Sequence, residues 1–233
     1  EETQEIVGRR MIELGLKKVA SIHYPNDFMI RGTNAIQRVL KERGVKYVTH
    51  TTKKGQINFK EILLECKEHN VDGYVFLGYK EFGFAMKQAR DLGIKAPFYG
   101  STVLLDPAYY DNSEGVIKGT ECLFFTPADG NYILATQFLE EYKNKYGNTP
   151  FSVWPPMQAY DAMNIVLEQL KKINIEKDDG EAVSDWLRKK LYQVHYYQGV
   201  CGNLSINEDG ASQGICFSLY KYHDKGKLIK VRR

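Results

Sequence analysis

Aromatic and hydroxyl-bearing side chains follow three of the apolar runs in this sequence. Tyr79 comes directly after a glycine that closes one run, and Ser101 and Thr102 come directly after the glycine that closes the next. Phe28 follows an earlier run within a few residues. An aromatic ring beside hydroxyl groups can hold a small molecule that has both apolar and hydrogen-bonding parts. These residue types therefore predict binding chemistry.

The elements that would position these side chains are parallel strands, predicted at Lys18–His23, Asp72–Gly78 and Pro97–Gly100. In open α/β sheets, ligands bind outside the carboxyl ends of the strands, where backbone N–H groups and helix N-termini are free. Phe28, Tyr79, Ser101 and Thr102 would then lie along one edge of the sheet, which we call the rim. The alternative for the two aromatic residues is that their rings only cover the core. The recurrence at three strand-to-helix junctions favours a binding site.

Residues 1–126 are expected to alternate between strands and helices. Helical spacing of apolar residues predicts helices near 3–14, 28–42, 59–68 and 80–92, and apolar runs predict further strands near 45–49 and 120–125. Asp27 is the expected N-cap of the second helix. This alternation predicts the fold class α/β, with a doubly wound parallel sheet and helices on both faces.

The pattern changes after residue 126. Three helices are predicted in a row, at about Tyr132–Lys145, Met157–Lys172 and Glu181–Val194, and strands return over residues 198–231, beginning with one at Gly199–Ile206. Three amphipathic helices without strands between them need an apolar surface to cover. The preceding sheet does not obviously supply that surface.

Composition excludes several classes of protein. The chain has 233 residues, 43% of them hydrophobic, and a formal net charge of +3 without a basic stripe, so no nucleic-acid partner is expected. No apolar run approaches the roughly 20 residues that span a bilayer. The chain opens with Glu1 and shows no signal peptide, so we expect a processed chain or a fragment.

Catalytic motifs are not found. The string "GYVFLGYK" at 73–80 is close to a phosphate-binding loop, but Tyr79 precedes the lysine and the intervening residues are typical of a strand. Five histidines are scattered without an i, i+4 pair, and no cysteines have zinc-site spacing. We therefore expect no enzyme activity, no cofactor and no metal site. Cys201 and Cys216 flank a predicted turn, so they either form a cross-strand disulfide or, as we favour, remain free thiols.

The order of elements and several strings resemble the type I periplasmic binding proteins, in particular the leucine/isoleucine/valine-binding branch of amino-acid ABC transporters. The matching strings are "KKVASIHYPNDF" at 17–28, "VDGYVFLGYKEFGFAMKQARDLGIKAPFYG" at 71–100, "EGVIKGT" at 114–120, "FLEEYKNKYGNTP" at 138–150, "AYDAMNIVLEQL" at 159–170 and "GVCGNLSINEDG" at 199–210. They occur in the family's order and cover nearly the whole chain.

The resemblance implies two lobes that close around a hinge on a small molecule. Residues 1–126 would form one complete α/β lobe, with the C-terminal strands of about 201–233 returning near it. Residues 128–200 would be the helical part of a second, incomplete lobe. The N-terminal part of the first lobe in chain order would be missing, which would leave an apolar face exposed unless another chain covers it.

The resemblance also implies roles for individual residues. Tyr79 matches a tyrosine that packs on the ligand, and Phe28 stands where the family often has a tyrosine. Trp154 could close the pocket; the alternative is a core tryptophan. Thr102 stands where the branched-chain binders have an acid that pairs with the ligand's ammonium group.

The departure at Thr102 affects the expected ligand. A buried ammonium group without a carboxylate partner is costly. Either Glu81 or Asp27 supplies the acid, or the ligand is not an α-amino acid. A small carboxylate or an aromatic or amide compound would fit the second case.

The function expected from the resemblance is that of a solute-binding protein of an ABC importer, which captures an amino acid or a related small carboxylate or amide by hinge closure. Its partners would be that ligand and the membrane permease. Its location would be extracytoplasmic, in the periplasm or lipid-anchored at the cell surface. The alternatives are the extracellular sensor domain of a membrane receptor or kinase and the effector-binding domain of a transcription regulator.

Overall fold

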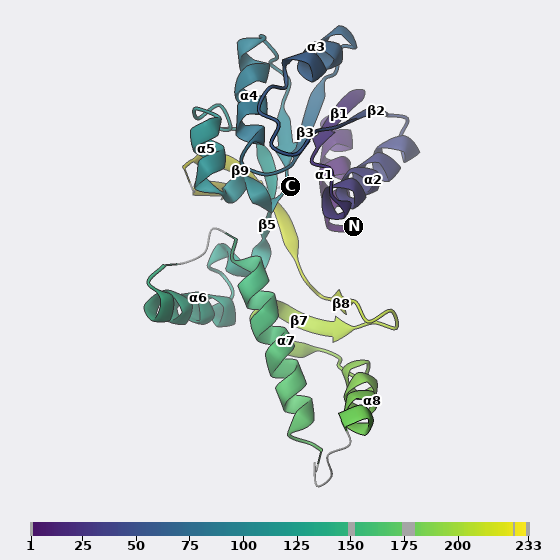
Figure 1. Ribbon diagram of the computed structural model, residues 1–233, viewed down its shortest axis with the longest axis vertical. Coiled ribbons are helices and arrows are strands. Elements are labelled where there is room, and N and C mark those ends of the chain that lie inside the picture. Colours follow the sequence, from purple (N-terminus) through teal and green to yellow (C-terminus); the bar gives the residue numbers. More distant parts are fainter. Residues whose placement is uncertain (1, 149–151, 174–179, 226, 232–233) are drawn as a thin grey trace. The chain divides into compact units, whose positions relative to one another are not determined.

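The computed structural model describes residues 2–148, 152–173, 180–225 and 227–231 (Figure 1). Contacts within the chain divide it into two compact units. Unit 1 comprises Glu1–Phe124 and Phe217–Arg233, and unit 2 comprises Phe125–Cys216. Residues 201–216 thus group with unit 2, and only the strands after them group with unit 1. The assignment of the two units to a complete and an incomplete lobe stays a proposal.

The described part of unit 1 contains a seven-stranded sheet in the order β10-β9-β5-β4-β3-β1-β2. The strands are β1 (Lys18–His23), β2 (Lys46–Thr51), β3 (Gly73–Leu77), β4 (Phe98–Gly100), β5 (Glu121–Phe125), β9 (Phe217–Asp224) and β10 (Lys227–Lys230). β1 pairs in parallel with β2 and β3, β3 with β4, and β4 with β5. β10 pairs antiparallel with β9 at the edge. The predicted α/β fold with a mainly parallel sheet is confirmed.

Helices cover both faces of this sheet. The helices are α1 (Glu2–Glu13) and α2 (Asp27–Glu42) on one face, and α3 (Lys60–Glu68), α4 (Phe82–Asp91) and α5 (Pro107–Asn112) on the other. Met11 of α1 and Ile36 of α2 share a buried cluster with Val75 of β3. Met86 of α4 shares the second cluster with Phe76, the next residue of the same strand. Successive side chains of β3 are therefore buried on opposite faces, as in other parallel sheets.

A glycine directly follows β3 and another ends β4, and packing leaves no room for a side chain at either position. A Cβ atom at Gly78 would overlap the ring of Phe82. A Cβ atom at Gly100 would overlap the side chain of Leu104. Each strand can therefore pass closely beneath the helical segment that follows it. The residue after each glycine begins the segment at the edge of the sheet.

The N-terminus of α2 differs from the prediction. The side chain of Asn26, and not that of Asp27, accepts a hydrogen bond from the backbone N–H of Met29 at 2.8 Å. Asp27 is instead the exposed first residue of the helix, where a carboxylate is favourable because of the helix dipole. Asparagine and aspartate cap helices about equally well, so residue type alone could not decide whether Asn26 or Asp27 is the N-cap of α2.

The described part of unit 2 contains three α-helices, a 3-10 turn and a small antiparallel sheet in the order β6-β7-β8. These elements are η2 (Thr126–Asp129), α6 (Ile133–Tyr146), α7 (Trp154–Leu170), α8 (Gly180–Leu191), β6 (Tyr197–Gly199), β7 (Gly202–Ile206) and β8 (Ser212–Gln213).

The single strand predicted at Gly199–Ile206 is wrong. The chain turns between β6 and β7, so that Gly199 lies opposite Gly202 in an antiparallel pair. Gly202 has a φ of +112°, a backbone conformation that glycine adopts readily and other residues rarely do. The two cysteines nearby are free thiols, Cys201 buried and Cys216 exposed, in agreement with the alternative that we favoured.

Asp161 of α7 fixes this turn. Its side chain is buried, and its carboxylate accepts hydrogen bonds from the backbone N–H groups of Val200 at 2.8 Å and Cys201 at 2.7 Å. The hydroxyl group of Tyr132 donates to the carbonyl of Gly199 at 2.8 Å. Hydrogen bonds to an ionised acceptor are about twice as strong as neutral ones, so α7 and the β6–β7 turn form a tightly joined pair.

Candidate functional site

The segments that follow β1, β3 and β4 meet at one edge of the unit 1 sheet. These three strands are neighbours in the order β4-β3-β1 and run parallel, so their carboxyl ends lie side by side. A backbone hydrogen bond of 2.8 Å from the N–H of Tyr24 to the carbonyl of Leu77 joins the first two segments directly. This edge is where the sequence placed the candidate rim.

Tyr24, Asn26 and Tyr79 form a polar aromatic cluster at this edge, which we call the rim cluster. The rings of Tyr24 and Tyr79 meet edge to face, with centroids 5.1 Å apart and an interplanar angle of 77°. This is a favoured geometry for aromatic pairs. The amide Nδ2 of Asn26 donates to the hydroxyl oxygen of Tyr79 at 3.1 Å. The ring of Tyr79 is therefore held from two sides while 44% of the residue remains exposed.

Asn26 orients the hydroxyl group of Tyr79. Its Oδ1 atom is occupied by the cap bond to the N–H of Met29, so its Nδ2 atom is the one that faces Tyr79. The Tyr79 oxygen accepts this bond and keeps its own O–H to donate. The rim cluster therefore presents a phenol as a hydrogen-bond donor beside an aromatic surface.

The other predicted site residues lie in different surroundings. Phe28, in the first turn of α2, is 55% exposed. Ser101 is buried, and its Oγ atom accepts from the N–H of Val103 at 3.5 Å, which caps η1 (Thr102–Leu105). Thr102 is partly buried at the start of η1. Trp154, the first residue of α7, is partly buried in unit 2.

The structure therefore brings Phe28, Tyr79, Ser101 and Thr102 to the same edge of one sheet, and Trp154 belongs to the other unit. Their roles in binding stay predictions.

A buried histidine lies at the end of β1, just before the rim cluster. His23 is 5% exposed, and its Nε2 atom is 3.0 Å from Oγ1 of Thr51 on β2. Burial, and next the positive charge that His50 can carry, lower the pKa of His23. His23 is therefore held in its neutral form at neutral pH. It supplies a polar but uncharged support beneath the rim.

Carboxylates near the rim are not buried. Asp27 is exposed at the start of α2, and Glu81 is partly buried just before α4.

Within the described residues, no group of three or more His, Cys, Asp or Glu side chains is arranged to hold a metal ion. Among those same residues, no helix is both long and apolar enough to cross a membrane. The side chains held at this edge offer aromatic contact and hydrogen-bond donation.

A sequence profile described as "Periplasmic binding protein" matches residues 2–227. The chain belongs to this family. The resemblance inferred from the sequence is therefore confirmed at the level of the family. A comparison with curated protein sequences finds no match.

Solved structures of related proteins share the fold. The leucine-binding protein LivK of Thermotoga maritima superposes with a TM-score of 0.80 at 20% identity, and LivJ of Streptococcus pneumoniae in complex with isoleucine with 0.72 at 22%. A Rhodopseudomonas palustris solute-binding protein in complex with benzoate superposes with 0.74 at 14% identity. These three comparisons cover 99%, 97% and 99% of this chain, but only 64%, 62% and 62% of the respective relatives.

Tyr24 and Asn26 were not among the residues predicted for the site. Both lie in the loop after β1, where the sequence indicated only a helix N-cap at Asp27. A signal was present, because Tyr24 follows its strand directly, as Tyr79 follows the glycine after β3. The hydrogen bond between Asn26 and Tyr79 spans 53 residues in sequence and could not be read from spacing.

Proposed function

We propose that this chain acts in solute binding and captures a small molecule at the rim of unit 1. Membership of the periplasmic binding protein family supports this role. The single observation that carries it is the rim cluster, because Asn26 and Tyr24 fix the ring and the hydroxyl group of the exposed Tyr79. A rigid, partly apolar surface with a few fixed polar groups is typical of small-molecule sites.

The groups at this edge favour a ligand with a hydrogen-bond acceptor. The hydroxyl oxygen of Tyr79 accepts a hydrogen bond from Asn26, and the Oγ atom of Ser101 accepts one from a backbone N–H. The O–H groups of both residues can therefore donate to a ligand. A carboxylate or carbonyl oxygen is the natural partner for such donors. The exposed ring of Phe28 suits an apolar or aromatic body. We therefore propose a small carboxylate or amide, with an amino acid included when Asp27 or Glu81 can meet its ammonium group.

Membership of the family supports a wider proposed role. In this role, the protein acts outside the cytoplasm and delivers its ligand to the membrane permease of an ABC importer. Closure of two lobes around the ligand is the proposed signal of occupancy, since a ligand that binds one conformation better shifts the population towards it. We propose no catalytic step, because the rim holds hydrogen-bond donors and aromatic rings and no paired acid and base.

Thermal unfolding with a ligand panel tests this function. The panel contains leucine, isoleucine, benzoate and related small carboxylates and amides. A ligand present at about 100 times its Kd stabilises the folded state by about 2.7 kcal/mol, which is a clear rise in Tm. We expect at least one member to raise the Tm. Tyr79→Ala should weaken its affinity by roughly tenfold or more, since both a ring contact and a donor are lost.

Tyr146→Ala is the matched control. Tyr146 of α6 is 59% exposed and has one ring neighbour, Tyr142, at 4.6 Å, much as Tyr79 has Tyr24. This variant should bind as the parent chain does. A panel in which no compound raises the Tm would contradict the proposed function. A ligand that binds the Tyr79→Ala variant with unchanged affinity would refute the placement of the site.

A further inference from the structure

Four polar groups of Asn26 are engaged in hydrogen bonds. Its backbone N–H donates to the carbonyl of Tyr24 at 2.9 Å, and its backbone carbonyl accepts from the N–H of Ile30 at 2.9 Å. Its Oδ1 atom accepts from the N–H of Met29 at 2.8 Å, and its Nδ2 atom donates to the hydroxyl oxygen of Tyr79 at 3.1 Å. The side-chain amide cannot turn over without losing the helix cap, so its orientation is fixed.

This orientation sets the direction of the hydrogen bonds at the rim. An amide nitrogen only donates, so the Tyr79 oxygen accepts from Asn26 and its O–H remains to donate. The Oγ atom of Ser101 accepts from the N–H of Val103 at 3.5 Å and therefore has the same polarity. A carboxylate or carbonyl oxygen matches these two donors. An ammonium group, which can only donate, does not.

The polarity depends on a single atom of Asn26. Aspartate has the same shape and caps helices about equally well. In an Asn26→Asp variant, one carboxylate oxygen would still accept from the N–H of Met29. The other would stand where Nδ2 stands now, and it could only accept from the O–H of Tyr79. The Tyr79 oxygen would then offer a lone pair to a ligand in place of a hydrogen atom.

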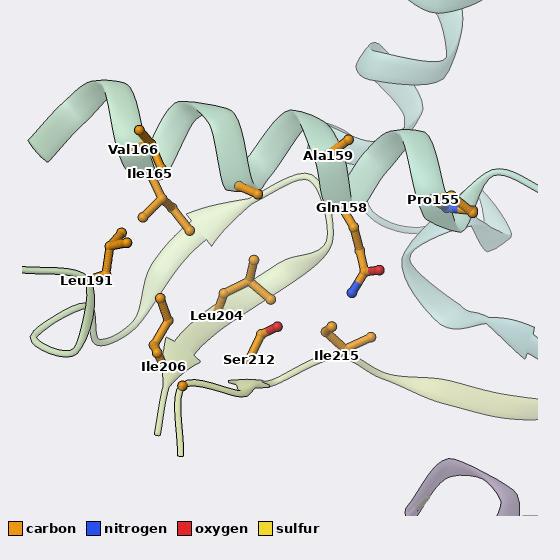
Figure 2. A pocket seen from close by; sticks show the side chains of 12 residues that line it. Pro155, Gln158, Ala159, Ile165, Val166, Leu191, Leu204, Ile206, Ser212 and Ile215 are labelled. Carbon is orange, nitrogen blue, oxygen red and sulfur yellow. The ribbon is translucent and has the colours of Figure 1, made fainter. Parts of the chain in front are cut away.

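A groove between α7 and β7 of unit 2 lacks this kind of selectivity (Figure 2). Its volume is about 500 Å³, and Figure 2 shows the side chains of Ile165, Leu204 and Ile206 pointing into it. The residues that line it are uncharged, and Gln158 and Ser212 are the polar side chains among them. A mostly apolar wall disfavours a carboxylate and an ammonium group alike, because both lose hydration there. Selection between the two groups is therefore a property of the rim.

We propose that Asn26 is the positioning residue that determines specificity at the rim. Through Tyr79, it selects a ligand that presents a carboxylate or carbonyl oxygen and rejects one that presents an ammonium group. Sites that fix the direction of a hydrogen bond discriminate strongly, because the wrong ligand leaves polar groups unpaired. This inference rests on the proposed function, since it names the residue that chooses among ligands of the proposed site.

Raman spectroscopy tests the role of Asn26 without a ligand. The intensity ratio of the tyrosine Fermi doublet distinguishes a hydroxyl group that accepts a hydrogen bond from one that only donates. The contribution of Tyr79 is the difference between spectra recorded with and without the substitution Tyr79→Phe. We expect Asn26→Asp to shift this contribution towards that of a strong donor. Circular dichroism should show an unchanged fold, because the cap of α2 is kept.

Two matched probes test the selection itself. Isocaproate is leucine without its ammonium group, and isoamylamine is leucine without its carboxylate. Benzoate and benzylamine form a second pair with an aromatic body. Titration calorimetry should show that the parent chain binds the carboxylate of a pair at least tenfold more tightly than the amine. Asn26→Asp should lower this ratio of affinities by at least tenfold, since a hydrogen bond to a charged group is reversed.

Three further variants serve as controls. Asn207→Asp adds the same charge in unit 2, next to Ile206 of the groove, at a side chain that also accepts from backbone N–H groups. It should leave the ratio of affinities unchanged. Asn26→Asp in a Tyr79→Phe background should change the ratio by much less than tenfold, because the hydroxyl group is gone. Asn26→Ser keeps a capping oxygen without the amide and should also lower the ratio.

Four outcomes would overturn the inference. An unshifted Raman ratio would mean that Asn26 does not set the polarity of Tyr79. An unchanged ratio of affinities would refute the selection and leave the proposed function standing. An equal effect in the Tyr79→Phe background would assign the selection to the added charge alone. A shifted Raman ratio without binding of any probe would mark the failure of the proposed function, and the selection would fail with it.

Discussion

At the scale of single residues, Asp161 shows how one buried charge shapes unit 2. Asp161→Ala would leave the N–H groups of Val200 and Cys201 without their acceptor in a buried turn. We expect a loss of about 2–6 kcal/mol in the free energy of unfolding, since each of the two buried donors left unsatisfied costs about 1–3 kcal/mol. Both tryptophans of the chain, Trp154 and Trp186, lie in unit 2, so their fluorescence follows this transition in urea.

Glu168→Ala is the control for this prediction. Glu168 is the other charged residue of α7 and is exposed, so its removal should change stability by less than about 0.5 kcal/mol. Equal urea midpoints of unfolding for Asp161→Ala and Glu168→Ala would mean that the turn between β6 and β7 does not depend on the carboxylate of Asp161.

His23 makes the stability of unit 1 decrease as the pH falls. Its pKa in the folded chain is lowered by burial and then by His50, so the unfolded chain takes up a proton first as the pH falls. The stability that the neutral ring contributes is complete above about pH 6.5, the ordinary histidine pKa, and declines below it. The slope is at most about 1.4 kcal/mol per pH unit for one proton.

Urea unfolding followed by circular dichroism between pH 7.5 and pH 5 measures this slope. His23→Asn removes the titrating group and should flatten the decline. His223→Asn, at an exposed position of β9, should leave it as it is in the parent chain. A decline that His23→Asn does not alter would assign the acid sensitivity to other groups.

At the scale of elements, an ion pair joins the first helix to the middle of the sheet. Arg10 of α1 donates to both carboxylate oxygens of Glu121 on β5, at 2.9 Å and 3.2 Å. The side chain of Glu121 is only 8% exposed, and Lys221 is 3.9 Å away. Arg10→Ala would leave this buried carboxylate with a weaker partner. We expect a loss of about 3 kcal/mol, at the lower end for a broken buried pair because Lys221 remains.

Arg9→Ala on the same helix is the comparison. Arg9 is 60% exposed and pairs with Glu5 one turn away, an arrangement worth roughly 0.5 kcal/mol at most. Thermal unfolding of Arg10→Ala and Arg9→Ala compares the stability that the two ion pairs contribute. Similar Tm values for both would show that the Arg10–Glu121 pair adds nothing beyond a surface ion pair.

Most elements could be predicted from the sequence because their signals are local. The apolar runs of unit 1 and the helical spacing between them gave the alternating order, and each observed strand of the parallel sheet falls within a few residues of its expected place. The turn at Val200–Cys201 could not be predicted this way, since it depends on a carboxylate 39 residues earlier in the chain. The partner of Asn26 was missed for the same reason.

At the scale of the whole molecule, the chain contains one well-formed sheet unit and one unit with an apolar helix face. The candidate site residues Phe28, Tyr79, Ser101 and Thr102 all belong to unit 1. The ends of the apolar runs pointed to these four positions, and the family resemblance pointed to Phe28, Tyr79 and Thr102 among them. Strand order places the four at one edge.

We propose that a small molecule binds at the carboxyl ends of β1, β3 and β4. Hydrogen–deuterium exchange with and without the best compound of the ligand panel tests it most directly. We predict protection of backbone amides in residues 24–30, 78–82 and 101–103. Protection confined to the amides around the α7–β7 groove, such as residues 204–206, would contradict the claim.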